Sequence, residues 1–325
     1  MNQWRVVWIF TTLSWWSSTV VCTVTSKSVL GDSTDVWLVS CSQLLCSAVM
    51  GLIVSQGRYG TSCINTSTSI ESIDAEPLHK QHATSSCGQR KSLLRFSTLL
   101  YICGVSHAVA AVTTNYSFCQ TSAVLTHVVK ASEPLCTLLL KFFISGEKPT
   151  VSSASSIGVV FVGVILLTSG HTGRRYGILC AIVSNFALSV RSVCTDILTK
   201  QRPHLTSDIF FHSNKNATII SFCSFAFFTY RYGGFPIDYP SYELILLPTT
   251  SFFIYNYCGT ILLAKCPLEL YALLNVCRRV FVIVITSLIY KLDGFRGKSI
   301  LGIACVTLGL FTYEYGRVNR TTAKS

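Results

Sequence analysis

The sequence predicts an all-α integral membrane protein with ten transmembrane helices in two inverted five-helix repeats. Half of the 325 residues are hydrophobic and only 12% are charged, whereas a soluble domain carries about 25% charged residues. Apolar runs of about 20 residues, long enough to cross a bilayer, recur along the chain. Two segments in opposite halves also share a pattern of cations and glycines. Together these observations predict a single membrane transporter domain, residues 1–325.

The length criterion divides the chain into ten predicted helices, joined mostly by short connections that favour antiparallel neighbours. They cover residues 4–26, 34–56, 93–113, 121–145, 151–169, 176–199, 208–230, 243–264, 267–290 and 298–316. The polar segment 57–92 is rich in Ser, Thr and His and is expected to be disordered. The halves are then about residues 1–170 and 171–325.

An internal repeat supports this division. In the first half Lys130 is followed by Gly146 and then by IGVVFVGVILL, and in the second half Arg278 is followed at the same spacing by Gly294 and then by LGIACVTLGLF. Five helices per half would give the two halves opposite topology. Inverted repeats with the site at their interface are a known transporter plan. The alternative is that any two apolar helices with glycines look alike.

Few charged residues lie deep inside the predicted helices. A charge at membrane depth costs about 2.5–3.5 kcal/mol on insertion scales, so such residues indicate a functional site by default. Pro134 cannot donate a helical hydrogen bond to the carbonyl of residue 130, which weakens the helix beside a charge. The charged residues are Lys130 and Glu133 in 121–145, Arg191 and Asp196 in 176–199, and Arg278 and Arg279 in 267–290.

Local pairing would neutralise part of this charge. Glu133 lies one helical turn from Lys130, and its expected role is that of a structural partner of this lysine. Asp196 follows Arg191 in the same predicted helix. If both acids pair in this way, about two positive charges remain near the midplane, because four cations stand against two acids. In the alternative, these cations bind no ligand and only pair with acids and backbone carbonyls, which holds the helix bundle together.

An excess of two positive charges suits a divalent oxyanion such as phosphate or a phosphate monoester. The arginine guanidinium presents a planar fork to phosphate oxygens, whereas the lysine ammonium offers a point charge. The hydroxyl groups of Tyr255, midway along one predicted helix, and Thr114, at the end of another, can supply neutral donors. The sequence therefore predicts an anion site between the predicted helices 121–145 and 267–290.

Other function classes find less support in the sequence. The 15 cysteines show no CxxC or Cys/His spacing, so no metal and no cofactor are expected. No nucleophile–base pair stands out at membrane depth, so no catalytic residue is assigned and the chain is not expected to be an enzyme. The net charge of +12 comes without a basic tract, which argues against nucleic acid as a partner.

The segment THVVKASEP at residues 126–134 resembles the T-H-x-x-K-x-x-E-P signature of the plastid phosphate translocators. That family belongs to the drug/metabolite transporter superfamily and has ten helices in two inverted five-helix halves. The resemblance covers most of the chain from about residue 96 onward. The other segments that fit in register are VTTNYSF at 112–118, GEKPT at 146–150, IVSNFALSVRSV at 182–193, YN at 255–256 and NVCRRVFVIV at 275–284.

This resemblance implies an antiporter that exchanges inorganic phosphate for phosphorylated C3 compounds by alternating access. The substrates would be triose phosphate, 3-phosphoglycerate and phosphoenolpyruvate, in a monomer or homodimer whose other contact is membrane lipid. Arg191 would reach the end of the substrate remote from phosphate. The residues onto which the family's phosphate site maps are Thr114, Lys130, Tyr255, Arg278 and Arg279.

Two departures from the family pattern concern substrate choice. The family usually has Lys-Arg where this chain has Arg278 and Arg279. Triose-phosphate carriers tend to place His three residues before the threonine, where this chain has Ala111, which removes a donor and widens the pocket. The expected substrate range is therefore broad and takes in both the triose-phosphate and the phosphoenolpyruvate classes.

The start of the chain bears on location. It lacks a long transit peptide rich in Ser and Arg, and an apolar run begins a few residues after Met1, which predicts an uncleaved signal anchor. With the resemblance, this implies an apicoplast-type plastid envelope, with its outer membrane as one candidate. Two alternatives stay open: a nucleotide-sugar transporter of the same superfamily in the Golgi or ER membrane, and a membrane receptor or scaffold without transport.

Overall fold

In the computed structural model of the chain, every assigned element of the described residues is helical. The described residues are 2–30, 36–62, 86–133, 136, 140, 155, 158–159, 162–163, 166, 175–232, 242–266, 268–290, 301–302, 304–305, 307–309 and 312. Five helices are long and apolar enough to span a membrane, namely Val7–Val29, Val36–Gly57, Arg95–Gln120, Arg175–Gln201 and Ile245–Lys265. The protein is thus an all-α membrane protein, and the ten-helix inverted repeat stays a prediction.

The observed helices follow the predicted order. Their bounds are α1 Asn2–Val29, α2 Val36–Ser62, α3 Ser86–Gln120, α4 Ala123–Lys130, α7 Arg175–Gln201, α8 Thr206–Tyr232, α9 Tyr242–Lys265 and α10 Leu268–Ile289, with the 3₁₀ turn η2 Pro203–Leu205 between α7 and α8. The helices predicted at 151–169 and 298–316 lie mostly outside the described residues, as does the centre of the predicted polar segment 57–92.

Helix α3 is longer than the predicted helix 93–113 at both ends. In its polar C-terminal part, hydroxyl groups find hydrogen-bond acceptors in the preceding turn: Thr113 Oγ1 donates to the carbonyl of Val109 at 2.6 Å. Thr114 makes the same contact to Ala110 and so lies inside the helix rather than at its end. Because α3 begins at Ser86 and α2 runs to Ser62, the polar segment is also shorter than predicted.

Helix α4 covers the first part of the predicted helix 121–145; a turn at 131–132 interrupts it, and the described residues 133, 136 and 140 are again helical. Ser122 caps its N-terminus, with a hydroxyl oxygen that accepts a backbone hydrogen bond of 3.2 Å. The helix ends at Lys130, and Ser132 continues as a turn, its N–H bonded to the carbonyl three residues earlier at 3.1 Å. This interruption is where the missing N–H of Pro134 predicts it, although that proline lies outside the described residues.

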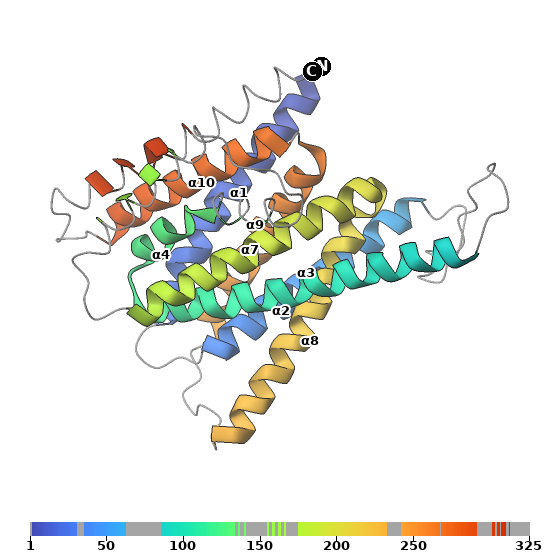
Figure 1. Cartoon of the computed structure of the whole chain (residues 1–325), viewed down its shortest axis with the longest axis horizontal. Coiled ribbons are helices and arrows are strands. Elements are labelled where there is room, and N and C mark those ends of the chain that lie inside the picture. The colour runs from blue at the N-terminus through green and yellow to red at the C-terminus, as the bar shows by residue number, and fades with distance from the viewer. Residues whose placement is uncertain are drawn as a thin grey trace.

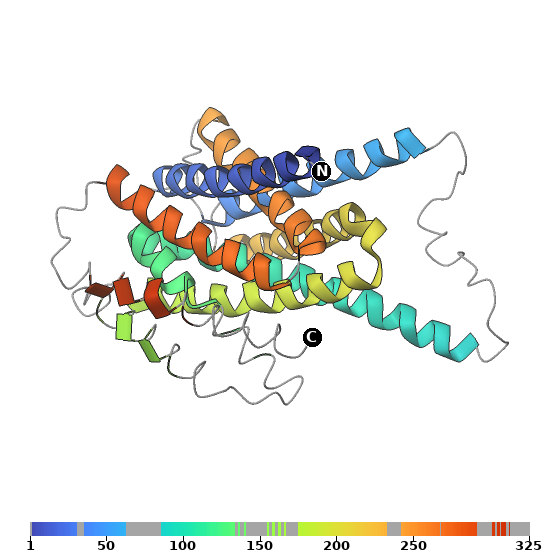
Figure 2. The same cartoon turned by 90° about the horizontal axis from the view of Figure 1, so that it is seen from above.

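The helices pack so that segments distant in sequence become neighbours (Figures 1 and 2). Helix α3 lies along α7 and also contacts α8, while α1 lies along α9, and α2 packs against α8 and α9. Helix α4 packs against both α7 and α10, so the two helices predicted to face each other across the site are in contact. This arrangement turns the cations of α4, α7 and α10 toward one central region.

A small residue sets the approach of α3 to α8. A Cβ atom at Gly104 would lie 2.5 Å from the Cβ of Asn216, closer than van der Waals contact allows. Small residues at such positions let membrane helices approach closely. One turn along α3, the same contact places His107 Nε2 3.1 Å from Asn214 Oδ1. Close packing here therefore fixes one wall of the central cavity.

Candidate functional site

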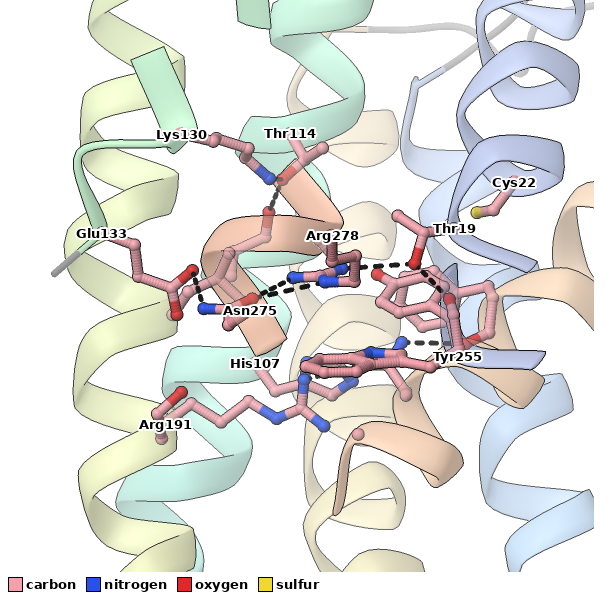
Figure 3. Close-up of a pocket in the computed structure, with 18 of the residues that line it drawn as sticks. Thr19, Cys22, His107, Thr114, Lys130, Glu133, Arg191, Tyr255, Asn275 and Arg278 are labelled. Atoms are coloured by element: carbon pink, nitrogen blue, oxygen red, sulfur yellow. Dashed lines mark hydrogen bonds between the residues drawn. The ribbon is translucent and has the colours of Figure 1, made fainter. Parts of the chain in front are cut away.

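A cavity lies in the centre of the bundle, lined by side chains from α1, α2, α3, α4, α7, α9 and α10 (Figure 3). Glu133, just after α4, also lines it. The cavity brings together all of the residues that the sequence nominated for a site: Thr114, Lys130, Arg191, Tyr255, Arg278 and Arg279. The structure thus shows that they share one cavity, and their role in binding is developed below as a proposal.

Lys130 occupies the last position of α4 and is 5% exposed. Its ammonium donates a hydrogen bond to the hydroxyl oxygen of Thr114 on α3. This hydroxyl lies 2.7 Å from Ser184 Oγ, which in turn donates to the carbonyl of Ala110 at 3.1 Å. A lysine ammonium has three protons, and only one protein acceptor is found for it among the described residues, so it retains donors for a ligand.

Arg278 is held from several directions. Its Nε and Nη2 atoms donate to Asn275 Oδ1 at 3.3 and 2.7 Å, and Nη1 donates to Thr19 Oγ1 at 3.3 Å. Its guanidinium carbon lies 4.6 Å from the ring centroid of Trp15, a cation–π contact. Trp15 itself stacks on Tyr271 with centroids 5.4 Å apart. The guanidinium plane is therefore fixed before any ligand arrives.

Arg279 forms a buried ion pair with Glu133, the two side chains being 6% and 10% exposed. Asn275 Nδ2 donates to the same carboxylate oxygen at 3.4 Å. The expectation that Glu133 partners Lys130 is therefore wrong. An i,i+3 pair needs a continuous helix, but α4 ends at Lys130, and the turn that follows points the carboxylate toward α10 instead.

The expected pair of Asp196 with Arg191 is also wrong. Asp196 accepts from Lys200 at 2.7 Å, on a side of α7 where that lysine is 63% exposed. A residue four positions away lies on the same helix face, whereas one five positions away does not. Arg191 instead donates from Nη1 to Asn256 Oδ1 on α9 at 2.7 Å. Arg191 therefore reaches the cavity without a carboxylate partner among the described residues.

The cavity has a larger charge excess than predicted. Four cations and one carboxylate, Glu133, line it among the described residues, which leaves three positive charges rather than about two. No described carboxylate lies within 4 Å of Lys130, Arg191 or Arg278. Charges act strongly on one another where the local dielectric is low. Within the part of the chain that is described, this arrangement is complementary to an oxyanion with more than one negative charge.

Several polar residues of the cavity were missed by the sequence reasoning. Asn275 lies one turn before Arg278 and Asn256 follows Tyr255, so their positions beside predicted site residues could have indicated them. His107 lies two turns before Thr114 on the same face of α3. Thr19 and Trp15 had no comparable signal, because only the fold brings α1 to α10.

The chain is similar to known proteins over most of its length. The model of the Triose-phosphate Transporter family matches residues 6–314. Phosphoenolpyruvate/phosphate translocator 1 of Arabidopsis thaliana is 24% identical over 220 residues, covering 65% of this chain and 54% of that protein. Phosphoenolpyruvate/phosphate translocator 3 of Oryza sativa subsp. japonica is 27% identical over 232 residues, covering 67% and 58%.

Shorter and more distant matches agree with these. The triose phosphate/phosphate translocator of Pisum sativum is 31% identical over 96 residues, covering 29% of this chain and 24% of that protein. The chain thus spans about half the length, or less, of the curated relatives that it matches. A solved crystal structure matches 96% of both chains with a TM-score of 0.58 at 14% identity, a likeness of fold alone.

Proposed function

The chain belongs to the Triose-phosphate Transporter family, and on that premise we propose that it exchanges inorganic phosphate for phosphorylated C3 compounds across its membrane. The observation that supports this most is the buried cavity with four cations and one carboxylate among its described lining residues. Phosphate and phosphate monoesters carry about two negative charges near neutral pH and offer several acceptor oxygens. They meet both the charge and the donors that this cavity presents.

In the proposed complex, the phosphate group lies between α4 and α10. Lys130 contributes a point charge, and Arg278 contributes a guanidinium fork whose plane Asn275 and Trp15 already hold. The hydroxyl group of Tyr255 adds a neutral donor at the cavity wall. The hydroxyl group of Thr114 donates to the carbonyl of Ala110, and it contributes to the site by holding the Lys130 ammonium in place.

In the structure, the Glu133 carboxylate binds the Arg279 guanidinium where a carboxylate or phosphate oxygen of the ligand would otherwise bind. Binding of phosphate would divide this guanidinium between the ligand and Glu133. An arginine has five N–H donors, so it can serve both partners at once.

The same charges explain why transport of one substrate in one direction would require transport of another in the opposite direction. An empty site would have to enclose an excess of cations, at about 2.5–3.5 kcal/mol per charge on insertion scales. A bound dianion removes most of that barrier, so the loaded carrier changes sides readily and the empty one does not. The halves 1–170 and 171–325 would rock about the site, and the end of α4 at Lys130 provides a point at which that helix can bend.

The proposed substrates are triose phosphate, 3-phosphoglycerate and phosphoenolpyruvate, and the proposed location is a plastid envelope membrane. The names of the relatives support both, since these proteins are phosphoenolpyruvate/phosphate and triose phosphate/phosphate translocators of chloroplasts. The replacement of the expected histidine by Ala111 supports a broad range, because it enlarges the cavity and removes a donor.

Counter-exchange in proteoliposomes tests this proposal. Vesicles containing the purified protein are loaded with phosphoenolpyruvate, 3-phosphoglycerate, a nucleoside monophosphate or buffer, and uptake of radiolabelled phosphate is followed. Rapid uptake only into the C3-loaded vesicles is expected. Uptake driven by the nucleoside monophosphate alone would favour a nucleotide-sugar carrier, and no uptake in any vesicle would favour a receptor or scaffold.

A matched pair of variants assigns the transport to the cavity. Lys130→Met removes a buried cation of the site, whereas Lys200→Met removes an exposed lysine of the Asp196 pair outside it. We expect the first variant to exchange much more slowly at low phosphate concentration and the second to retain the rate of the unmodified protein. Equal rates in both variants would remove the cavity from the transport pathway.

A further inference from the structure

His107 on α3 lines the central cavity but was not among the residues nominated from the sequence. Its side chain is buried, with 2% exposure. Its ring stacks on Phe252 of α9 with centroids 5.8 Å apart, which holds the ring plane in place. A histidine fixed in this way presents its nitrogen atoms in defined directions.

The hydrogen bonds around His107 define which nitrogen has the proton. Asn214 Nδ2 donates to the carbonyl of Phe210 at 2.8 Å, so the amide oxygen of Asn214 points the other way. That oxygen lies 3.1 Å from His107 Nε2, which must therefore be the donor. In a neutral imidazole with Nε2–H, the Nδ1 atom is an acceptor. This Nδ1 is buried and has no partner among the described residues.

The position of His107 along the cavity follows from the register of α3 and α7. Thr114 contacts Ser184, whereas Cys103 Sγ lies 3.3 Å from Thr195 Oγ1, so the two helices run in opposite directions. His107 is thus on the level of Arg191, and about 10 Å of helix axis separates it from Thr114. Figure 3 shows His107 and Arg191 toward one end of the cavity and Lys130 with Thr114 toward the other.

A hydrogen-bond acceptor such as His107 Nδ1 is unusual at this end of the cavity. Arg191, the charged group at this end, is a donor only, and one of its donors already meets Asn256 Oδ1. A buried acceptor without a partner is unfavourable, so a ligand that donates to it gains affinity. Carboxylate, carbonyl and phosphate oxygens cannot donate, whereas an alcohol can.

We infer that His107 is a specificity-determining residue whose Nδ1 accepts a hydrogen bond from a hydroxyl group of the substrate, at the end remote from phosphate. The inference rests on the proposed function, because it takes phosphate to bind near Lys130. Within the proposed substrate range, this contact favours phosphates with a hydroxyl group at the remote end, such as dihydroxyacetone phosphate, over phosphoenolpyruvate, which has no free hydroxyl group and is bound less tightly. Sites built to hydrogen-bond a substrate hydroxyl reject the analogue that lacks it.

The test compares two ligands that differ by one hydroxyl group. Dihydroxyacetone phosphate, whose hydroxyl group is on the carbon remote from phosphate, and its deoxy analogue, 2-oxopropyl phosphate, each compete with radiolabelled phosphate for uptake into phosphate-loaded proteoliposomes. In the unmodified protein we expect dihydroxyacetone phosphate to inhibit at a concentration about tenfold lower than its deoxy analogue, the effect of one buried hydrogen bond. The ratio of the two inhibitory concentrations is the readout, so differences in the amount of active protein cancel.

Variants assign this discrimination to His107. His107→Phe is combined with Asn214→Leu, because the single change would leave the buried amide oxygen of Asn214 without its donor. We expect the ratio to fall close to one in this double variant. His212→Phe, which changes a histidine of α8 that does not line the cavity, serves as the matched control and should keep the ratio.

The outcomes separate the inference from the function on which it rests. Phosphate exchange with a ratio near one in the unmodified protein overturns the role of His107 and leaves the proposed function standing; a water molecule then satisfies Nδ1. A ratio retained in the folded double variant also overturns it. Absence of any phosphate exchange overturns the proposed function, and the inference falls with it. The ratio in the unmodified protein needs no variant, so a double variant that does not fold leaves the inference open to refutation.

Discussion

Helices α4 and α10 bring cations to the same cavity in different ways. α4 has 8 residues and ends at Lys130, whereas α10 runs through Arg278 and Arg279 for 22 residues without interruption. Lys130 has one hydroxyl oxygen as its protein acceptor among the described residues. Arg278 and Arg279 are held by Asn275, Thr19, an aromatic ring and a carboxylate.

The difference separates two roles for a buried charge. A cation with a carboxylate partner is part of the structure, because its removal leaves the partner buried and uncompensated. A cation without such a partner destabilises the empty protein and is retained for a ligand. Arg279 on α10 therefore supports both the fold and the site, whereas Lys130 on α4 serves the ligand. Substitutions of Arg279 and of Lys130 should then have opposite effects on stability.

The largest effect is expected for Arg279→Met. This change leaves the Glu133 carboxylate in a buried position without its ion-pair partner, which should lower the free energy of unfolding by about 3–5 kcal/mol. Thermal unfolding in detergent measures it. The double variant Arg279→Met with Glu133→Met removes both charges and should recover most of the stability but not transport. An Arg279→Met protein as stable as the unmodified one would contradict the structural role of the pair.

Lys130→Met should show the opposite combination. Loss of a charge-assisted hydrogen bond to phosphate should weaken phosphate binding about 10- to 100-fold, while removal of a buried cation should raise the melting temperature of the empty protein. The half-saturation constant for phosphate uptake and the melting temperature without phosphate measure the two effects. A drop in stability as large as that of Arg279→Met would erase the distinction between α4 and α10.

Asn275→Leu tests how Arg278 is held. The change removes the acceptor of two guanidinium donors and one donor to Glu133, while it leaves every charge in place. If Arg278 is held less well, we expect the free energy of phosphate binding to weaken by about 1 kcal/mol, which corresponds to a roughly fivefold higher half-saturation constant for phosphate. The maximal exchange rate at saturating phosphate should change less than this constant. An unchanged constant would show that the orientation of Arg278 does not matter for binding.

The smallest effect is expected for Trp15→Phe. A phenyl ring keeps an aromatic face under the Arg278 guanidinium, but its cation–π attraction is weaker than that of indole. We expect about a twofold higher half-saturation constant for phosphate. Trp15→Leu, which removes the π-system, should raise the constant further, and the order unmodified, Phe, Leu is the result to look for. The reverse order would exclude the cation–π contact as a contribution to binding.

The sequence predicted the fold class and the residues that line the cavity better than it predicted the contacts among those residues. Apolar length and the charges at membrane depth located α4, α7 and α10 and the four nominated cations, because both signals are local. The family resemblance placed Thr114 and Tyr255 in the same site. The partner of Glu133 could not be predicted, because it depends on where α4 ends and on which helix lies opposite. Trp15 was missed for the same reason, because only the packing of α1 against α10 brings it to the cavity. His107 shares a face of α3 with Thr114, and this spacing could have indicated it.

The central claim is that an excess of buried positive charge makes movement of the empty site unfavourable. Proteoliposomes loaded with labelled phosphate test it when efflux is measured into phosphate-free medium and into medium that contains saturating phosphate. The account predicts rapid efflux when phosphate is present outside and at least tenfold slower efflux when it is absent, since a difference of about 1.4 kcal/mol in the barrier already gives a factor of ten. Equal rates in the two media would contradict it.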